Sequence, residues 1–121
     1  MIEKVNLGEK FDLFHEHWSP RIAGQINNFH LKLVKVQGEF VWHHHDSEDE
    51  LFMVVKGRLR INIEGQDTVE LSEGEFVIIP HGVEHQPVAD EECHLILLEP
   101  AGTLNTGNTQ GELTVSEPET I

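Results

Sequence analysis

Three consecutive histidines lie in the middle of the chain, at positions 43 to 45. The chain contains 9 histidines in all, and short histidine-rich tracts are typical of metal sites. In an extended backbone alternate side chains point to the same face, so His43 and His45 should face one way and His44 the other. Two imidazoles on one face can bind the same divalent metal. The spacing therefore predicts metal binding by His43 and His45.

Several carboxylates follow the histidines, and only Glu50 is in phase with a buried segment. It begins the apolar run 51–55 and alternates in step with Phe52. A buried carboxylate needs a compensating partner, because an isolated buried charge is costly, and a bound metal would supply one. Glu48 and Asp49 lie in the preceding polar turn, where we expect them to be solvated.

A further candidate, His85, follows a loop that Pro80 and Gly82 should fix. Taken alone, this histidine carries little information. The other histidines have no motif support, and we expect surface or packing positions for them: His15, His17, His30, His81 and His94.

The segments that would position these residues are short and strand-like. Apolar residues alternate with polar ones or form short runs, and glycine or proline turns separate them. The acidic stretch 90–92 should be a solvated turn. The expected strands are 29–36, 51–55, 59–63, 69–71, 76–79 and 94–99. This pattern predicts an all-β sandwich or barrel.

The two ends of the chain differ from this strand region, which we place at 27–100. Residues 1–26 form an N-terminal segment with an apolar stripe at helical spacing, which we expect to pack on the barrel. Residues 101–121 are rich in Thr, Gly, Asn and Glu and are expected to form an extended C-terminal tail, partly ordered at best. The residues of the N-terminal stripe are Phe11, Phe14 and Trp18.

Composition limits the classes of function. The chain has 121 residues and a formal net charge of -14. This length suits one domain, and this charge argues against binding to nucleic acid or an anionic membrane. Cys93 is the single cysteine, which excludes an internal disulfide and suits a reducing compartment. No signal peptide is evident, so we expect a cytoplasmic protein.

Two motifs together resemble the cupin superfamily. The first is GEFVWHHHDSEDE at 38–50, closed by Gly57, and the second is GEFVIIPHGVEH at 74–85. They contain the glycine, His-x-His, glutamate and glycine of the first family motif, and the glycine, Pro-x-Gly and histidine of the second. The strands on either side extend the likeness to about 27–100. The chain is therefore identified as a small single-domain cupin.

The resemblance implies a double-stranded β-helix, the jelly-roll barrel of cupins and RmlC-like proteins. It also implies one divalent transition metal (Mn, Fe, Ni, Co, Cu or Zn). Many cupins have asparagine where this chain has Ala89, and this difference affects the local loop. A one-residue slip at a bulge would let His44 replace one of its neighbours. The implied metal ligands are His43, His45, Glu50 and His85.

Four ligands leave two positions free on an octahedral metal, which a substrate oxygen or O₂ could occupy. The resemblance then allows a metal-dependent enzyme acting on a small molecule, such as a dioxygenase, an isomerase or a decarboxylase. Phe52 and Val54, and with them Met53, are candidates for the apolar wall of its pocket. The alternatives are a metal-dependent module that binds or senses a small molecule without turnover, and a metal that only stabilises the barrel.

Arginines and aromatic residues bear on the partners of this chain. Arg58 and Arg60 could hold an acidic substrate group if one faced inward, but the alternating Leu59, Ile61 and Ile63 favour an outward position for both. Cupins commonly pair through outer sheet faces and terminal strands, so the resemblance also implies a homodimer. The N-terminal stripe would be available to contribute to it.

Overall fold

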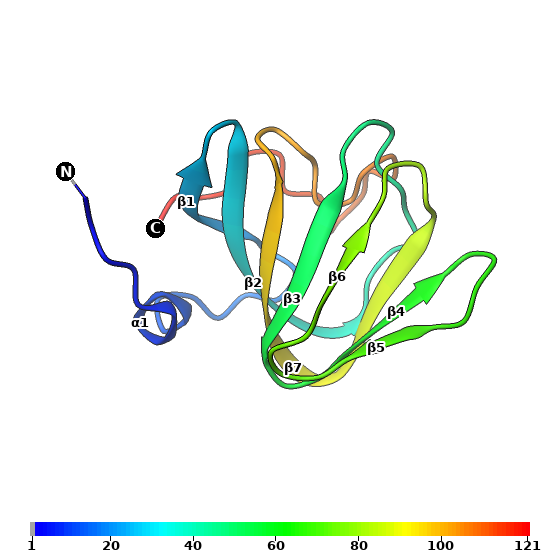
Figure 1. Cartoon of the computed structure of the whole chain (residues 1–121), viewed down its shortest axis with the longest axis horizontal. Helices are drawn as coiled ribbons and strands as arrows, with labels where there is room; N and C mark the ends of the chain where they lie inside the picture. Colours follow the sequence, from blue (N-terminus) through cyan, green and yellow to red (C-terminus); the bar gives the residue numbers. More distant parts are fainter. Residues whose placement is uncertain (1) are drawn as a thin grey trace.

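The computed structural model describes residues 2–121, which form a chain built almost entirely of antiparallel strands (Figure 1). The described part of the chain has no helix with the length and apolar character needed to cross a membrane. In chain order the elements are α1 (Leu7–Phe11), β1 (Arg21–Ile26), β2 (Phe29–Glu39), β3 (Glu50–Lys56), β4 (Leu59–Ile63), β5 (Val69–Leu71), β6 (Phe76–Ile79) and β7 (His85–Pro100).

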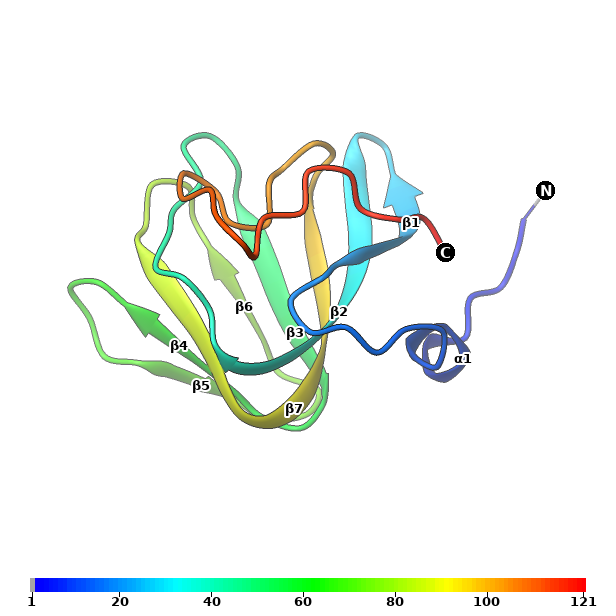
Figure 2. The ribbon, with the colours of Figure 1, turned by 180° about the vertical axis from the view of Figure 1, so that it is seen from behind.

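Strand β7 holds the barrel together. Its C-terminal part pairs with β2 on one side and β3 on the other, and its first residues pair with β4. The sheet has the order β1-β2-β7-β3-β6, and β5 pairs with the far side of β4. Figures 1 and 2 show β7 curving sharply between these regions. This curvature folds the sheet over on itself, and the predicted all-β jelly-roll fold is confirmed.

The prediction of a turn at 90–92 is wrong, because these residues lie within β7. Val36 and Gly38 of β2 are two positions apart (38 − 36 = 2), but their partners Cys93 and Ala89 are four apart (93 − 89 = 4). Strand β7 therefore carries two extra residues as a bulge, which bends a strand and increases its twist. The acidic residues stay exposed in this bulge.

Strand β2 is buried on both faces and therefore contributes to two apolar clusters. Val34 and Val36 belong to the core inside the barrel. Leu33 instead packs on the outer face of the sheet, against Phe11 and Phe14. The N-terminal segment thus covers part of the outer sheet face through these two aromatic residues, each 3% exposed.

The sheet begins earlier in the chain than expected. Strand β1 pairs with β2 from Arg21 onward, whereas the sequence predicts a strand region at 27–100. The C-terminus returns to the same strand, since Ile22 N–H donates to Glu119 O (2.8 Å) and Ile121 N–H donates to Ile22 O (2.9 Å). The division of the chain into three segments stays a prediction.

Candidate metal centre

The backbone brings His43 and His85 side by side. His43 N–H donates to His85 O (3.0 Å), and His85 N–H donates to His43 O (2.9 Å). The loop that contains Gly82 is fixed in turn, because Gly82 N–H donates to His45 O (2.7 Å). The two cupin-like motifs are thus joined directly, and the first residue of β7 lies opposite the histidine tract.

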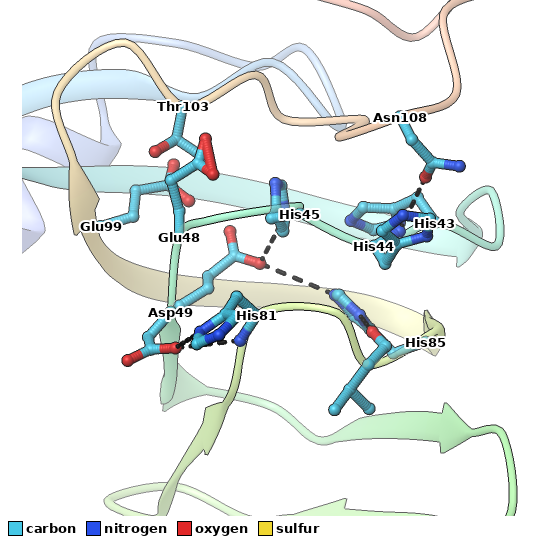
Figure 3. A network of polar contacts seen from close by, with 12 residues as sticks. His43, His44, His45, Glu48, Asp49, His81, His85, Glu99, Thr103 and Asn108 are labelled. Carbon is cyan, nitrogen blue, oxygen red and sulfur yellow. Dashed lines mark hydrogen bonds and ion pairs between the residues drawn. The ribbon is translucent and has the colours of Figure 1, made fainter.

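All four predicted ligand residues come together inside the barrel. One potential ligand atom from each lies within 4.8 Å of the others. Nε2 of His45 is 3.3 Å from Oε1 of Glu50, and Nε2 of His85 is 3.7 Å from the same oxygen (Figure 3). None of the four residues is more than 4% exposed. The four residues predicted from strand phase and motif spacing thus meet at one buried point.

Hydrogen bonds to the backbone determine which ring nitrogens of two of the histidines face this buried point. His43 Nδ1–H donates to Val41 O and His85 Nδ1–H donates to Val83 O, both at 2.9 Å. Because a carbonyl only accepts, each Nδ1 carries a proton, so that in the neutral ring the lone pair is on Nε2. Buried polar atoms are nearly always hydrogen-bonded, yet within residues 2–121 Nε2 of all three histidines and Oε1 of Glu50 have no hydrogen-bond partner. This donor set fits a divalent transition metal.

The electrostatics favour the protonation states that metal binding requires. Burial, followed by the neighbouring His85, lowers the pKa of His43 to about 4, so the ring is neutral at pH 7. Burial alone would raise the pKa of Glu50, but contacts with Glu99, His45 and His85 outweigh it and hold that pKa well below its usual value. Neutral imidazoles and an ionised carboxylate are the forms that bind metals.

His44 points away from the centre. Its Nδ1 lies 2.7 Å from a carboxylate oxygen of Glu84, and its Nε2 lies 2.9 Å from one of Asp46. The alternative in which His44 replaces His43 or His45 is therefore wrong in this structure. Ala89 is 1% exposed and lies in β7, so the position where many cupins have asparagine is part of the core here.

Two buried charged residues beside the centre were missed in the sequence. Lys32 Nζ donates to Glu99 Oε1 (2.8 Å) and to Thr103 O (3.3 Å). Burial and the nearby Glu50 carboxylate raise the pKa of Glu99 well above its usual value, although Lys32 acts in the opposite direction. The burial of Glu99 could have been predicted from the sequence, because Glu99 alternates in phase with Leu95 and Leu97 just as Glu50 does with Phe52.

A small pocket lies beside His43 and Glu50 inside the barrel, and we call it the inner pocket. Its volume is about 30 Å³, room for about two water-sized molecules. Phe52 is among its lining residues, whereas Val54 is not and is fully buried in the core. Met53 faces the other way and is half-buried.

Aromatic rings close one side of the inner pocket. Trp18 stacks on Phe40 with ring centroids 4.6 Å apart, and Phe40 meets His43 edge-on at 5.4 Å. Trp18 therefore packs on the barrel core rather than with the outer N-terminal stripe. Among residues 2–121, no lysine or arginine lines this pocket.

Arg58 and Arg60 lie away from the candidate centre. Both line a groove beside β4 and the bulge of β7, and Arg60 forms an ion pair with Asp90 at 2.6 Å. Leu59, Ile61 and Ile63 are buried, so the predicted outward position of the two arginines is confirmed.

Comparison with known proteins agrees with this geometry. A model of the family described as "Cupin domain" matches residues 30–99, more than half of the chain. The chain belongs to the cupin family. In this cupin the matched region includes all four residues of the candidate centre, but it ends before the C-terminal segment.

Individual relatives are similar over most of the barrel. The crystal structure of a cupin-2 domain containing protein from Shewanella frigidimarina is 49% identical, with a TM-score of 0.77, and the match covers 79% of this cupin and 93% of that chain. Protein NMB1881 from Neisseria meningitidis is 29% identical, with a TM-score of 0.75 and coverage of 82% and 100%.

Among curated proteins, the uncharacterized protein YdbB of Bacillus subtilis is 36% identical over 62 residues. The match covers 51% of this cupin and 55% of YdbB, so the chain spans about half the length of that relative.

Proposed function

We propose that this cupin binds one divalent transition metal through His43, His45, Glu50 and His85. The observation that supports the proposal is the convergence of three histidine Nε2 atoms and one carboxylate oxygen, all buried and without hydrogen-bond partners among residues 2–121. The metal would be Mn, Fe, Ni, Co, Cu or Zn, since such a mixed donor set suits this group.

We further propose that the protein is a metal-dependent enzyme acting on a small molecule. A bound metal would supply a Lewis acid or a redox centre with coordination positions left for a ligand. The protein itself contributes the apolar aromatic wall formed by Phe52, Phe40 and Trp18. It also fixes the rings of His43 and His85 through backbone carbonyls, and such outer hydrogen bonds hold ligand geometry.

Metal analysis of the purified protein tests the first proposal. We expect about one metal ion per chain in the wild type, and loss of the metal in His85→Ala and Glu50→Gln. His44→Ala is the matched control, because this neighbouring histidine points away from the centre and should keep its metal. Equal metal content in all four proteins would refute the site.

Turnover of a small-molecule panel by the metal-loaded protein tests the second proposal. Tight binding of a compound without turnover, for every candidate metal, would favour the binding or sensing module instead. If the metal only stabilised the barrel, His45→Ala would lower the melting temperature together with the metal content, and neither binding nor turnover would be found.

We also propose that the protein forms a cytoplasmic homodimer. Phe76 and Ile78 are 57% and 53% exposed on β6, which ends the sheet order, and exposed apolar patches often mark interfaces. Phe11 and Phe14 cannot contribute as suggested, because they are buried within their own chain. The buried free thiol of Cys93 suits a reducing compartment. Sedimentation that gives a monomer at micromolar concentration would refute the dimer.

A further inference from the structure

The chain beyond β7 lies over the candidate metal centre. Asn108 is hydrogen-bonded to both backbone groups of His44, since its N–H donates to His44 O (3.0 Å) and its Oδ1 accepts from His44 N–H (2.8 Å) (Figure 3). Thr109 Oγ1 donates to Trp42 O at 3.2 Å. The C-terminal segment is thus attached to the histidine tract itself.

Gly107 makes the closest approach of this segment. A Cβ atom built at this position would lie 2.2 Å from His44 O and 3.1 Å from Cδ2 of His43, and its φ is +54°. The backbone therefore contacts a candidate metal ligand at a point where no other residue fits without displacement.

Hydrogen bonds within the C-terminal segment hold this backbone in place. Asn105 Nδ2 donates to Leu113 O (2.7 Å), and Asn105 Oδ1 accepts from Val115 N–H (2.8 Å). The hydroxyl groups of Thr106 and Thr114 are 2.7 Å apart, and Thr106 is 1% exposed. Residues 103–109 thus form a packed layer, which we call the outer wall.

A second pocket lies between the outer wall and the histidine tract, and we call it the outer pocket. It has a volume of about 280 Å³ and is lined by residues 45–48 on one side and by Leu104, Gly107 and Asn108 on the other. His45, a candidate ligand, is therefore shared between the centre and this pocket. The inner pocket holds about 30 Å³, room for about two waters, so the outer pocket offers far more space for a ligand beside His45.

The outer pocket is acidic. Asp46 and Glu48 are among its lining residues, and no lysine or arginine from residues 2–121 is. A cleft lined by one sign of charge raises the local concentration of counter-ions and repels ions of its own sign. The net charge of the chain, -14, acts in the same direction.

We infer that the outer wall and residues 45–48 form the route by which ligands reach the metal, and that this route selects neutral or cationic molecules against anions. The inference rests on the proposed metal binding. It deepens that proposal by stating a substrate class, a small molecule without a phosphate or free carboxylate. The wall lies beyond the matched family region, which ends at residue 99.

The charge of the route is tested with the full-length protein loaded with Co²⁺, whose visible absorption reports a new ligand. The probes are azide, an anion, and imidazole at pH 8, where it is mostly neutral. In the double variant Asp46→Asn, Glu48→Gln we expect the association rate of azide, relative to that of imidazole, to be about tenfold higher than in the wild type at low salt. This difference between the variant and the wild type should shrink at high salt. An unchanged ratio of the two rates would overturn the charge selection.

The wall is tested with Gly107→Ala, against Gly111→Ala as matched control. A Cβ at Gly111 would have no atom of the described part of the chain within 4 Å, so the control makes the same change in the same segment without displacement. We expect Gly107→Ala to raise the rates of both probes together, with their ratio unchanged. If Gly107→Ala does not fold, Asn108→Ala removes only the side-chain bond to His44 and should raise both rates to a smaller extent. Rates equal to those of the control would overturn the wall.

A metal-independent measurement separates this inference from the metal site. In the metal-free protein, diethyl pyrocarbonate modification of His43, mapped by mass spectrometry, should increase several-fold in Gly107→Ala over Gly111→Ala, because Gly107 lies against this ring. If cobalt does not bind but the modification increases in Gly107→Ala, the metal site is refuted and the outer wall is supported. Cobalt binding with equal modification and equal probe rates would refute the wall and keep the metal site.

Discussion

The ammonium group of Lys32 lies 2.8 Å from the carboxylate of Glu99, and both side chains are buried beside the candidate metal centre. The two partners are not equivalent. Glu99 can become neutral by taking a proton, since burial and Glu50 already raise its pKa. Loss of Glu99 would leave the buried Lys32 ammonium as an uncompensated charge, so it should be the more costly change.

We predict an asymmetry between the two single substitutions of this pair. Glu99→Met should destabilise the protein by about 3–5 kcal/mol, because it leaves a buried ammonium unpaired. Lys32→Met should cost about 1–3 kcal/mol, the range for one buried acceptor that has lost its donor. The double variant should be more stable than Glu99→Met, since buried ion pairs can be replaced by apolar groups. Urea unfolding measures all three, and equal costs for both single variants would contradict the asymmetry.

The buried pair also shows what sequence patterns can and cannot predict. Two-residue alternation correctly placed Glu50 in the barrel, and the same argument would have found Glu99. Lys32 was not recognised, although it is in step with Val34 and Val36 on the inner face, because the apolar Leu31 and Leu33 alternate on the opposite face of β2. Local alternation does not show which face of a strand will be covered when another segment, here residues 7–14, buries the outer face.

The outer wall could not be predicted for a different reason. Residues 103–109 have no apolar periodicity, and small polar residues are typical of disordered tails as well as of packed turns. Their order comes from hydrogen bonds to the distant His44 and Trp42 backbone, which no local pattern encodes. The candidate ligands were predictable because each belongs to a motif with fixed spacing.

The low pKa of His43 predicts a pH dependence of stability in the metal-free protein. Its pKa is about 4 in the folded state against 6.5 when unperturbed, so below pH 6.5 the unfolded state binds the extra proton. The stability present above pH 6.5 is therefore lost as the pH falls toward 4. Between pH 7 and pH 5 we expect a loss of about 2 kcal/mol from this group.

Urea unfolding at a series of pH values checks the contribution of His43. His43→Leu should be less dependent on pH than the wild type in the window from pH 7 to pH 5, whatever its absolute stability. Contacts with His17 and then His94 lower the pKa of Glu92 to about 2, so this residue contributes to the pH dependence of stability mainly below this window. An identical slope in the variant would contradict the assignment to His43.

The packing of the N-terminal segment predicts a contrast between adjacent residues. Phe14 is 3% exposed in the outer apolar cluster, whereas Leu13 is 64% exposed. Phe14→Ala should lower the free energy of unfolding by about 3 kcal/mol, and Leu13→Ala should change it by less than about 0.5 kcal/mol. A small effect of Phe14→Ala in urea unfolding would show that residues 7–14 do not stabilise the barrel.

Gly57 closes the first cupin motif, and the structure gives its role. Its φ is +93°, and an added Cβ would lie 3.1 Å from Glu92 O and 3.2 Å from Cα of Cys93, so the turn between β3 and β4 presses against the bulge of β7. Gly65 has a similar φ of +85° but open space around it, and it is the matched control. Gly65→Ala should cost about 1 kcal/mol for the left-handed backbone alone, and Gly57→Ala should cost about 1 kcal/mol more, because backbone atoms must also shift. Equal melting temperatures for the two variants would show that Gly57 is required only for its backbone conformation and not for the contact with β7.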